Sequence, residues 1–238
     1  MSTVLSTRGL SRSFSGLRAV HQVDFDLPAG EIRALIGPNG AGKSTFVNML
    51  IGRISPGSGS IRFDGQDITA LPAHRRVARG MAYTFQITSV FLRLSLEENV
   101  ALAARRRLRH DKAAVRAEVA GALERVGLAD RMGQIAADLS YGHQRLLEIA
   151  MGLAQAPRLL ILDEPTQGLA ESEIAGFKGL IRSLVPATTI LLIEHNMNVV
   201  MQLADRVSVL NFGEILAEGT PAEIHANADV QAAYLGTG

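Results

Sequence analysis

The chain has 238 residues, and its 24 Lys and Arg against 23 Asp and Glu give a formal net charge of +1. Hydrophobic residues make up 47%, which is typical of a globular protein and excludes a largely disordered one. This near-balance of charge gives no reason to expect a nucleic-acid partner. The absence of cysteine excludes disulfides, a thiol nucleophile and any site with cysteine ligands.

Neither a signal peptide nor a membrane span is predicted. The first ten residues lack the apolar stretch of a signal peptide, and nowhere do about 18 apolar residues follow one another, as a spanning helix requires. We therefore expect this chain to reach a membrane only through a partner.

Three short aliphatic runs predict the central strands of one parallel sheet. They cover Ile32–Ile36, 159–162 and Thr189–Ile193, and each ends at polar residues or glycine. The first run is followed by a glycine-rich turn and a predicted helix over Lys43–Leu50, which Gly52 ends. The first unit is therefore a strand, a loop and a helix.

Further patterns predict two additions to this core. Residues 20–27 and 60–68 alternate apolar and polar side chains, and Asp64-Gly65 is typical of a two-residue hairpin turn, so an antiparallel β lobe is expected. Residues 96–126 favour helix, with apolar residues at helical spacing, and predict a helical insertion. Residues 211–214 separate two more strand-like runs, and a helix is predicted from residue 222.

Residues 37–44 (GPNGAGKS) fit the phosphate-loop pattern G-x-x-x-x-G-K-S/T between a buried strand and a helix. Its glycines let successive N–H groups point at phosphate oxygens, and the helix dipole adds positive potential there. A lysine then serves the β and γ phosphates, a serine hydroxyl suits Mg²⁺, and a threonine hydroxyl can bond the α phosphate. The expected nucleotide-binding residues of this loop are Gly37, Pro38, Asn39, Gly40, Ala41, Gly42, Lys43, Ser44 and Thr45.

A phosphate loop alone does not distinguish an ATPase, a GTPase and a kinase, so a second acidic element has to decide. That element is Asp163-Glu164, directly after an aliphatic strand. Asp163 is suited to organise Mg²⁺ and its waters, and Glu164 to accept a proton from an attacking water. The pair predicts hydrolysis.

With three further elements, the chain resembles the ATP-binding cassette (ABC) ATPases. Residues 139–144 (LSYGHQ) look like the signature motif of that family, Gln86 stands at its Q-loop position, and His195 matches its switch histidine. The resemblance covers nearly the whole chain. It implies an α/β fold: a P-loop NTPase core with a mainly parallel sheet, an N-terminal antiparallel β lobe and an inserted helical subdomain. One domain over 1–238 is expected, with the RecA-like core and β lobe in 1–86 and 151–238 and the helical subdomain in 87–150.

The resemblance also implies ATP and Mg²⁺ as cofactors. Phe14 would stack on the adenine and Val20 would lie near the ribose. The implied catalytic residues are Glu164, His195 and Gln86, and the implied metal ligands are Ser44, Gln86 and Asp163.

A second copy of the cassette completes each site in this family. Ser140 and Gly142 would bind the γ phosphate of ATP held by the other copy, so that two sites are shared across a dimer. Loss of the γ phosphate would then open the dimer and drive a membrane partner.

Residues 80–86 and 211–221 most resemble the importer ATPases for branched-chain amino acids and urea. This implies the ATP-hydrolysing subunit of an importer for branched-chain amino acids or a related small polar solute. The implied partners are a second cassette, two permease subunits and an extracytoplasmic solute-binding protein, with no nucleic acid, at the cytoplasmic face of the inner or plasma membrane. The alternatives are an exporter ATPase of the lipopolysaccharide type, a soluble ABC ATPase outside transport, and a small-molecule kinase, which should lack residues 139–144 and Glu164.

The chain departs from the family pattern at three positions. His143 replaces the usual glutamine or glutamate of the signature, and Ala170 stands where aspartate, asparagine or serine is common. Met151 stands where arginine is frequent. These positions concern the signature contacts, the loop that crosses to the partner site and the signature helix.

Overall fold

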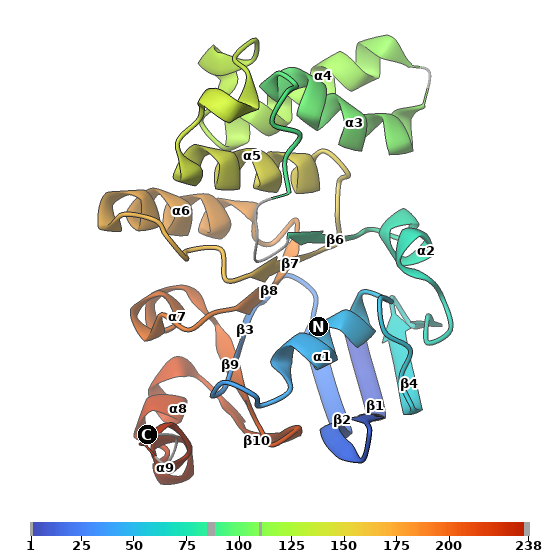
Figure 1. The fold of residues 1–238 in the computed structure, drawn as a ribbon, viewed down its shortest axis with the longest axis vertical. Coiled ribbons are helices and arrows are strands. Elements are labelled where there is room, and N and C mark those ends of the chain that lie inside the picture. Colours follow the sequence, from blue (N-terminus) through green and yellow to red (C-terminus); the bar gives the residue numbers. More distant parts are fainter. Residues whose placement is uncertain (1, 85–88, 110, 236–238) are drawn as a thin grey trace.

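A six-stranded sheet forms the centre of the computed structural model, which describes residues 2–84, 89–109 and 111–235 (Figure 1). Its strand order is β10-β9-β3-β8-β7-β6. Five of these strands are parallel, and β10 pairs antiparallel with β9. The strands are β3 (Ile32–Ile36), β6 (Met81–Thr84), β7 (Leu159–Asp163), β8 (Thr189–Ile193), β9 (Arg206–Asn211) and β10 (Glu214–Gly219).

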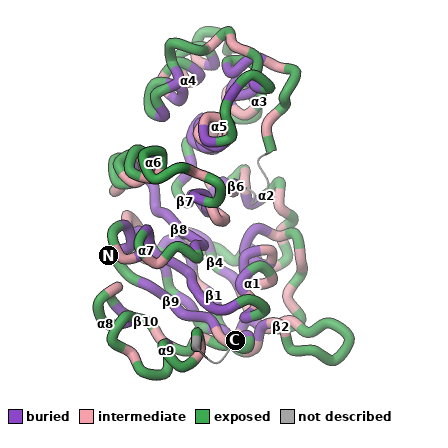
Figure 2. The backbone as a smooth tube through the Cα atoms, turned by 60° about the vertical axis from the view of Figure 1, so that its left-hand side comes forward, coloured by how far each residue is buried: buried purple, intermediate pink, exposed green. Residues whose placement is uncertain are grey.

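The three predicted central strands are confirmed as β3, β7 and β8. Every residue of β3 and β8 is buried, because helices and the second sheet cover both faces (Figure 2). The carboxyl ends of parallel strands meet at one edge of a sheet. The segments that follow β3, β7 and β8 therefore converge there, and they carry the phosphate loop, the acidic pair and His195.

The predicted antiparallel lobe is a second, four-stranded sheet of order β2-β1-β4-β5. Its strands are β1 (Thr3–Phe14), β2 (Leu17–Pro28), β4 (Ser58–Phe63) and β5 (Gln66–Asp67). The predicted hairpin turn is confirmed, since Asp64 and Gly65 both adopt positive φ between β4 and β5. Helix α1 (Lys43–Leu50) packs between the two sheets, where Phe46 shares one core cluster with Phe25 of the lobe and Ile161 of β7.

The helical subdomain contains α3 (Leu96–Leu108), α4 (Lys112–Arg125) and α5 (Tyr141–Leu153), and lies at the top of Figure 1. The predicted helical stretch 96–126 is two helices, because Arg109 leaves helical geometry and Asp111 caps α4 by accepting from the Ala114 N–H. Helix α3 begins with a reciprocal capping box between Ser95 and Glu98. The expected subdomain boundary after residue 150 falls inside α5, so this helix itself joins the subdomain to the core.

The remaining helices flank the six-stranded sheet. They are α2 (Ala73–Ala78), α6 (Glu171–Leu184), α7 (Met197–Leu203), α8 (Pro221–Ala226) and α9 (Ala228–Leu235). The predicted C-terminal helix is thus a pair, and Thr220 caps the first of them. Over the described ranges, no helix combines the length and the apolar character needed to cross a bilayer.

Candidate functional site

The phosphate loop joins β3 to α1, and its backbone requires glycine at the point where the helix begins. Gly42, the N-cap of α1, adopts φ 105°, and a Cβ built on it would lie 2.2 Å from the Ala19 carbonyl oxygen. A larger residue would therefore clash with β2. Gly42 brings no side chain to cap α1, so the first N–H groups of the helix remain available to a phosphate.

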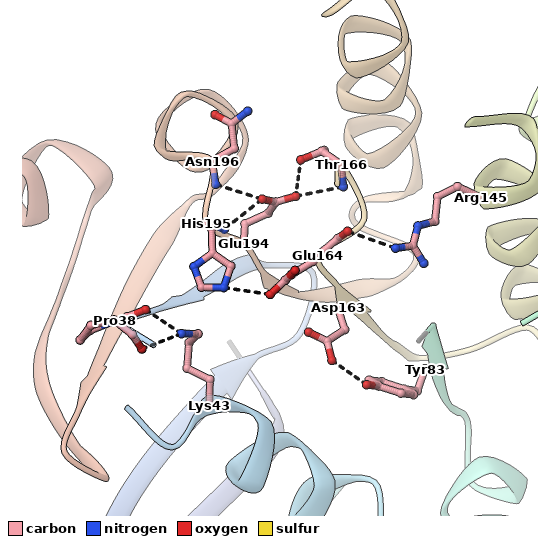
Figure 3. A network of polar contacts seen from close by, with 11 residues as sticks. Pro38, Lys43, Tyr83, Arg145, Asp163, Glu164, Thr166, Glu194, His195 and Asn196 are labelled. Atoms are coloured by element: carbon pink, nitrogen blue, oxygen red, sulfur yellow. Dashed lines mark hydrogen bonds and ion pairs between the residues drawn. The ribbon is translucent and has the colours of Figure 1, made fainter. Parts of the chain in front are cut away.

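Lys43 is aligned across this loop by two carbonyls. Its Nζ donates to the carbonyl oxygens of Gly37 at 2.6 Å and Pro38 at 3.0 Å (Figure 3). The side chain is buried, and burial lowers the pKa of Lys43, whereas the nearby carboxylates of Glu164 and Asp163 raise it. A cation and two carboxylates thus share one largely dry site, which suits a metal-bound polyphosphate.

The predicted residues of this loop lie together on the loop and the first turn of α1. They are Gly37, Pro38, Asn39, Gly40, Ala41, Gly42, Lys43, Ser44 and Thr45.

Asp163, the last residue of β7, receives a hydrogen bond from the neighbouring strand. The Tyr83 hydroxyl donates to its Oδ2 at 2.6 Å (Figure 3). Burial raises the pKa of Asp163, and the Tyr83 bond opposes that rise. Burial together with the bond to Asp163 raises the pKa of Tyr83, so the phenol stays a proton donor.

Glu164 and His195, two of the catalytic residues that the resemblance implies, lie in contact. His195 Nε2 lies 2.8 Å from Glu164 Oε1, at the ends of β8 and β7 (Figure 3). The Glu164 backbone adopts φ 47°; its N–H donates to the Ile193 carbonyl at 2.9 Å, and its carbonyl accepts from Arg145 Nη2 at 3.1 Å. The peptide groups on both sides of its Cα are therefore held, and the contact with His195 orients the carboxylate, a group that can accept a proton from water.

Magnesium would find oxygen ligands of the right kind here. Among the described residues no three His, Asp or Glu side chains gather into a metal cluster. Mg²⁺ is usually held by one or two protein carboxylates together with substrate phosphates and water. Asp163 and the exposed hydroxyl-bearing Ser44 at the start of α1 fit this description.

The signature residues lie on the helical subdomain. Ser140 is the N-cap of α5; its Oγ accepts from the His143 N–H at 3.3 Å and lies 2.9 Å from His143 Nδ1. Gly142 lies against α6, where a Cβ built on it would be 2.3 Å from Glu173 Oε1. Within one copy, these residues contact their own helix and α6.

Two expected nucleotide contacts differ in their surroundings. Phe14 is the last residue of β1 and is 40% exposed. The Arg12 guanidinium lies over its ring, 4.9 Å from the centroid. Val20 has a side chain that is 1% exposed and packs in the core between lobe and sheet, and its place near the ribose stays a prediction. Gln86 lies outside the described residues.

Sequence reasoning missed the residues that hold the predicted ones in place. Tyr83 lies within residues 80–86 and Glu194 directly precedes His195, but no role was predicted for either. Arg145 is fully buried, pairs with Glu148 at 2.8 Å and reaches the Glu164 carbonyl. The spacing of Arg145 and Glu148, three residues apart on one helix, was the available indication of this pair.

Two family models match the chain. A model described as ABC transporter covers residues 20–167. A second, described as branched-chain amino acid ATP-binding cassette transporter, covers residues 214–238.

Curated relatives align over almost the whole chain. The high-affinity branched-chain amino acid transport ATP-binding proteins BraF of Pseudomonas aeruginosa and LivG of Escherichia coli are 39% and 40% identical, over 98% of this chain and 98% of each relative. The lipopolysaccharide export system ATP-binding protein LptB of Escherichia coli is 35% identical over 98% of this chain and 97% of the relative.

Solved structures agree with the fold. A nucleotide-free ATP-binding cassette from an ABC transporter has a TM-score of 0.88 at 25% identity, covering 98% of this chain and 99% of that one. A dimeric post-hydrolysis cassette bound to ADP and phosphate has a TM-score of 0.82 at 23% identity, covering 91% and 98%. The family model over 20–167 and the full-length relatives lead to one conclusion: this chain belongs to the ABC transporter ATP-binding family.

Proposed function

We propose that this chain is the ATP-hydrolysing subunit of an ABC importer for branched-chain amino acids or a related small polar solute. The observation that carries hydrolysis is Glu164 Oε1 held 2.8 Å from His195 Nε2, at the sheet edge where the phosphate loop also begins. The importer assignment is supported by the C-terminal family match and by relatives at 39% and 40% identity.

The phosphate loop and Lys43 bind the triphosphate, with the N–H groups of α1 at its oxygens. Asp163 and Ser44, with Gln86, would hold Mg²⁺, which would supply positive charge to the bound triphosphate. Glu164 accepts the proton of the attacking water, and His195 contacts the γ phosphate while orienting Glu164.

Phe14 supplies an aromatic face for the adenine. Its ring is partly exposed at the end of β1, and Arg12 lies over it, so the base would compete with or stack beside that guanidinium.

A second cassette completes each site. Ser140 and Gly142 begin α5, where an N-terminal dipole and a hydroxyl suit the γ phosphate of ATP bound by the other copy. The dimeric ADP- and phosphate-bound cassette of similar fold supports this arrangement. Removal of the γ phosphate removes charge-assisted hydrogen bonds worth about 1.5 to 3 kcal/mol each, and the dimer opens.

That opening would be transmitted to two permease subunits, supplied by a solute-binding protein on the other side of the membrane. The cassette would then work at the cytoplasmic face of the inner or plasma membrane. An exporter of the lipopolysaccharide type is the second candidate, because LptB is 35% identical over the same length.

The test is to purify the assembled complex from its own cell through a tag on this chain and to identify the subunits by mass. We expect two permease chains and ATP turnover that rises when solute-loaded binding protein is added. Copurification with lipopolysaccharide-export components would replace the importer with the exporter. Copurification with ribosomes or DNA and no membrane subunit would refute transport.

A further inference from the structure

Glu194 is a buried carboxylate on which two loops converge. It directly follows β8 and is 3% exposed. Its Oε1 accepts from the Thr166 N–H at 3.1 Å and from the Thr166 hydroxyl. Its Oε2 accepts from the N–H groups of His195 at 3.0 Å and Asn196 at 3.1 Å (Figure 3).

This arrangement requires a carboxylate. Each oxygen faces two donors, and only an ionised Asp or Glu accepts at both oxygens without donating. A glutamine of the same size would turn its NH₂ group toward at least one backbone N–H, whichever way the amide points. We call these four hydrogen bonds from Thr166, His195 and Asn196 to Glu194 the Glu194 clamp. They are charge-assisted and buried, which strengthens them and holds the two loops in a fixed relative position.

The clamp closes a ring around the catalytic pair. Thr166 lies two residues after Glu164, and His195 lies one residue after Glu194. The remaining link is the contact between His195 Nε2 and Glu164 Oε1 at 2.8 Å. Any shift of one loop against the other therefore changes the distance between the proton acceptor and its histidine.

The same loop reaches the signature helix. Residues 166–170 lead from the clamp to α6, and a Cβ built on Gly168 would lie 3.0 Å from Cε1 of Tyr141. The Tyr141 ring is thus packed on this loop, next to Ser140. A chain of contacts therefore runs from His195 through the 166–170 loop to the start of α5. Glu194 forms its first link, between His195 and Thr166.

We propose that Glu194 is a positioning residue: it fixes the position of His195 relative to Glu164 and anchors the 166–170 loop to the segment that follows β8. It acts through His195, because both of its carboxylate oxygens accept from donors of the chain and the residue is only 3% exposed. The proposal rests on the proposed ATP hydrolysis. Because Lys43 and the phosphate loop do not depend on Glu194, the residue should affect turnover and leave ATP binding intact.

The experiment compares Glu194→Gln, Thr166→Val and Thr166→Ser in the full chain, with thermal unfolding recorded for each. Thr188→Val is the matched control: Thr188 is also buried, and its hydroxyl donates to the Pro157 carbonyl at 3.2 Å beyond the opposite end of β8. We expect Glu194→Gln to lower kcat about 10- to 100-fold, as small misplacements of catalytic groups do. The Kd for ATP should be unchanged. The kcat of Thr166→Val should lie between those of the wild type and Glu194→Gln, whereas the kcat of Thr166→Ser and that of Thr188→Val should match the wild type.

Wild-type kcat in both Glu194→Gln and Thr166→Val would overturn the proposal. So would an equal loss of kcat in Thr188→Val, because the effect would then be one of general stability. If Glu194→Gln does not fold, the contrast between Thr166→Val and Thr166→Ser decides, and equal kcat in these two overturns the proposal. A wild-type protein without ATP turnover would instead refute the proposed function.

Discussion

The nucleotide-binding edge of the sheet and the signature end of α5 are built in opposite ways. At the sheet edge Lys43 is 7% exposed and bonded to its own loop, and Asp163, Glu164 and His195 each have partners from other elements. At the start of α5, Tyr141 is 42% exposed and the bonds to Ser140 Oγ come from its own helix. The contacts of the first region lie within one copy, whereas in the proposed dimer the second region would offer a helix terminus to the partner.

Both regions are nevertheless connected through α5. One turn into the helix, Arg145 is fully buried, pairs with Glu148 at 2.8 Å and donates to the Glu164 carbonyl at 3.1 Å. A rotation of the helical subdomain therefore moves a group that touches the catalytic peptide. In the proposed dimer, the N-terminus of α5 would face the partner's nucleotide, while the buried Arg145 of the same helix supports Glu164 of its own copy.

Ser140→Arg should have the largest effect, a complete loss of ATP-dependent dimerisation. It changes only the exposed start of α5 and leaves the sheet edge intact. We expect ATP-dependent dimerisation to be abolished by the bulky charged side chain at the helix start, while each copy binds ATP as before. Light scattering with and without ATP measures this, with Ser58→Arg on the remote lobe as the control. A Ser140→Arg protein that still dimerises would place the partner's contact elsewhere.

Lys43→Ala should instead weaken ATP binding at the sheet edge. Loss of a charge-assisted contact worth about 1.5 to 3 kcal/mol should raise the Kd for ATP roughly 10- to 150-fold. Titration calorimetry checks this, and Lys112→Ala, at an exposed position in α4, is the matched control. An unchanged Kd would show that the triphosphate does not lie against this lysine.

Tyr83→Phe tests the hydrogen bond to Asp163 at the sheet edge through the pH dependence of turnover. Burial already raises the pKa of Asp163, and the Tyr83 bond lowers it, so removing the hydroxyl should raise that pKa further. Asp163 would then be protonated, and lost as a Mg²⁺ ligand, at a higher pH than in the wild type. We expect the acid limb of the rate against pH to move to higher pH, and more Mg²⁺ to be needed in that range. A superimposable pH profile would contradict this role.

His143→Gln should have the smallest effect. His143 occupies the signature, but its Nδ1 contacts Ser140 Oγ within the same helix turn, a contact that an amide can replace. Substitutions outside the core that keep the local hydrogen bond usually change free energies by less than about 0.5 kcal/mol, so steady-state turnover should change by less than about threefold. A loss above tenfold would indicate direct contact of His143 with the partner's nucleotide.

Local patterns predicted the elements and the loop, whereas contacts between distant segments did not follow from the sequence. The phosphate loop, the hairpin at Asp64 and the strands carry their own periodicity and turn chemistry. The bond from Tyr83 to Asp163 depends on the pairing of β6 with β7, which no local pattern specifies. The burial of Val20 on the inward face of β2, together with Val23 and Phe25, likewise depends on how the lobe packs against the central sheet.

The most direct test of the account is ATP turnover by the wild type and by Glu164→Gln. If Glu164 activates the water while Lys43 and the loop hold the nucleotide, turnover should fall by about 10²- to 10⁴-fold, the range for loss of a general base. The variant should still bind ATP and accumulate as an ATP-bound dimer. Glu171→Gln, on the exposed first turn of α6, should turn over like the wild type. Unchanged turnover in Glu164→Gln would contradict the account.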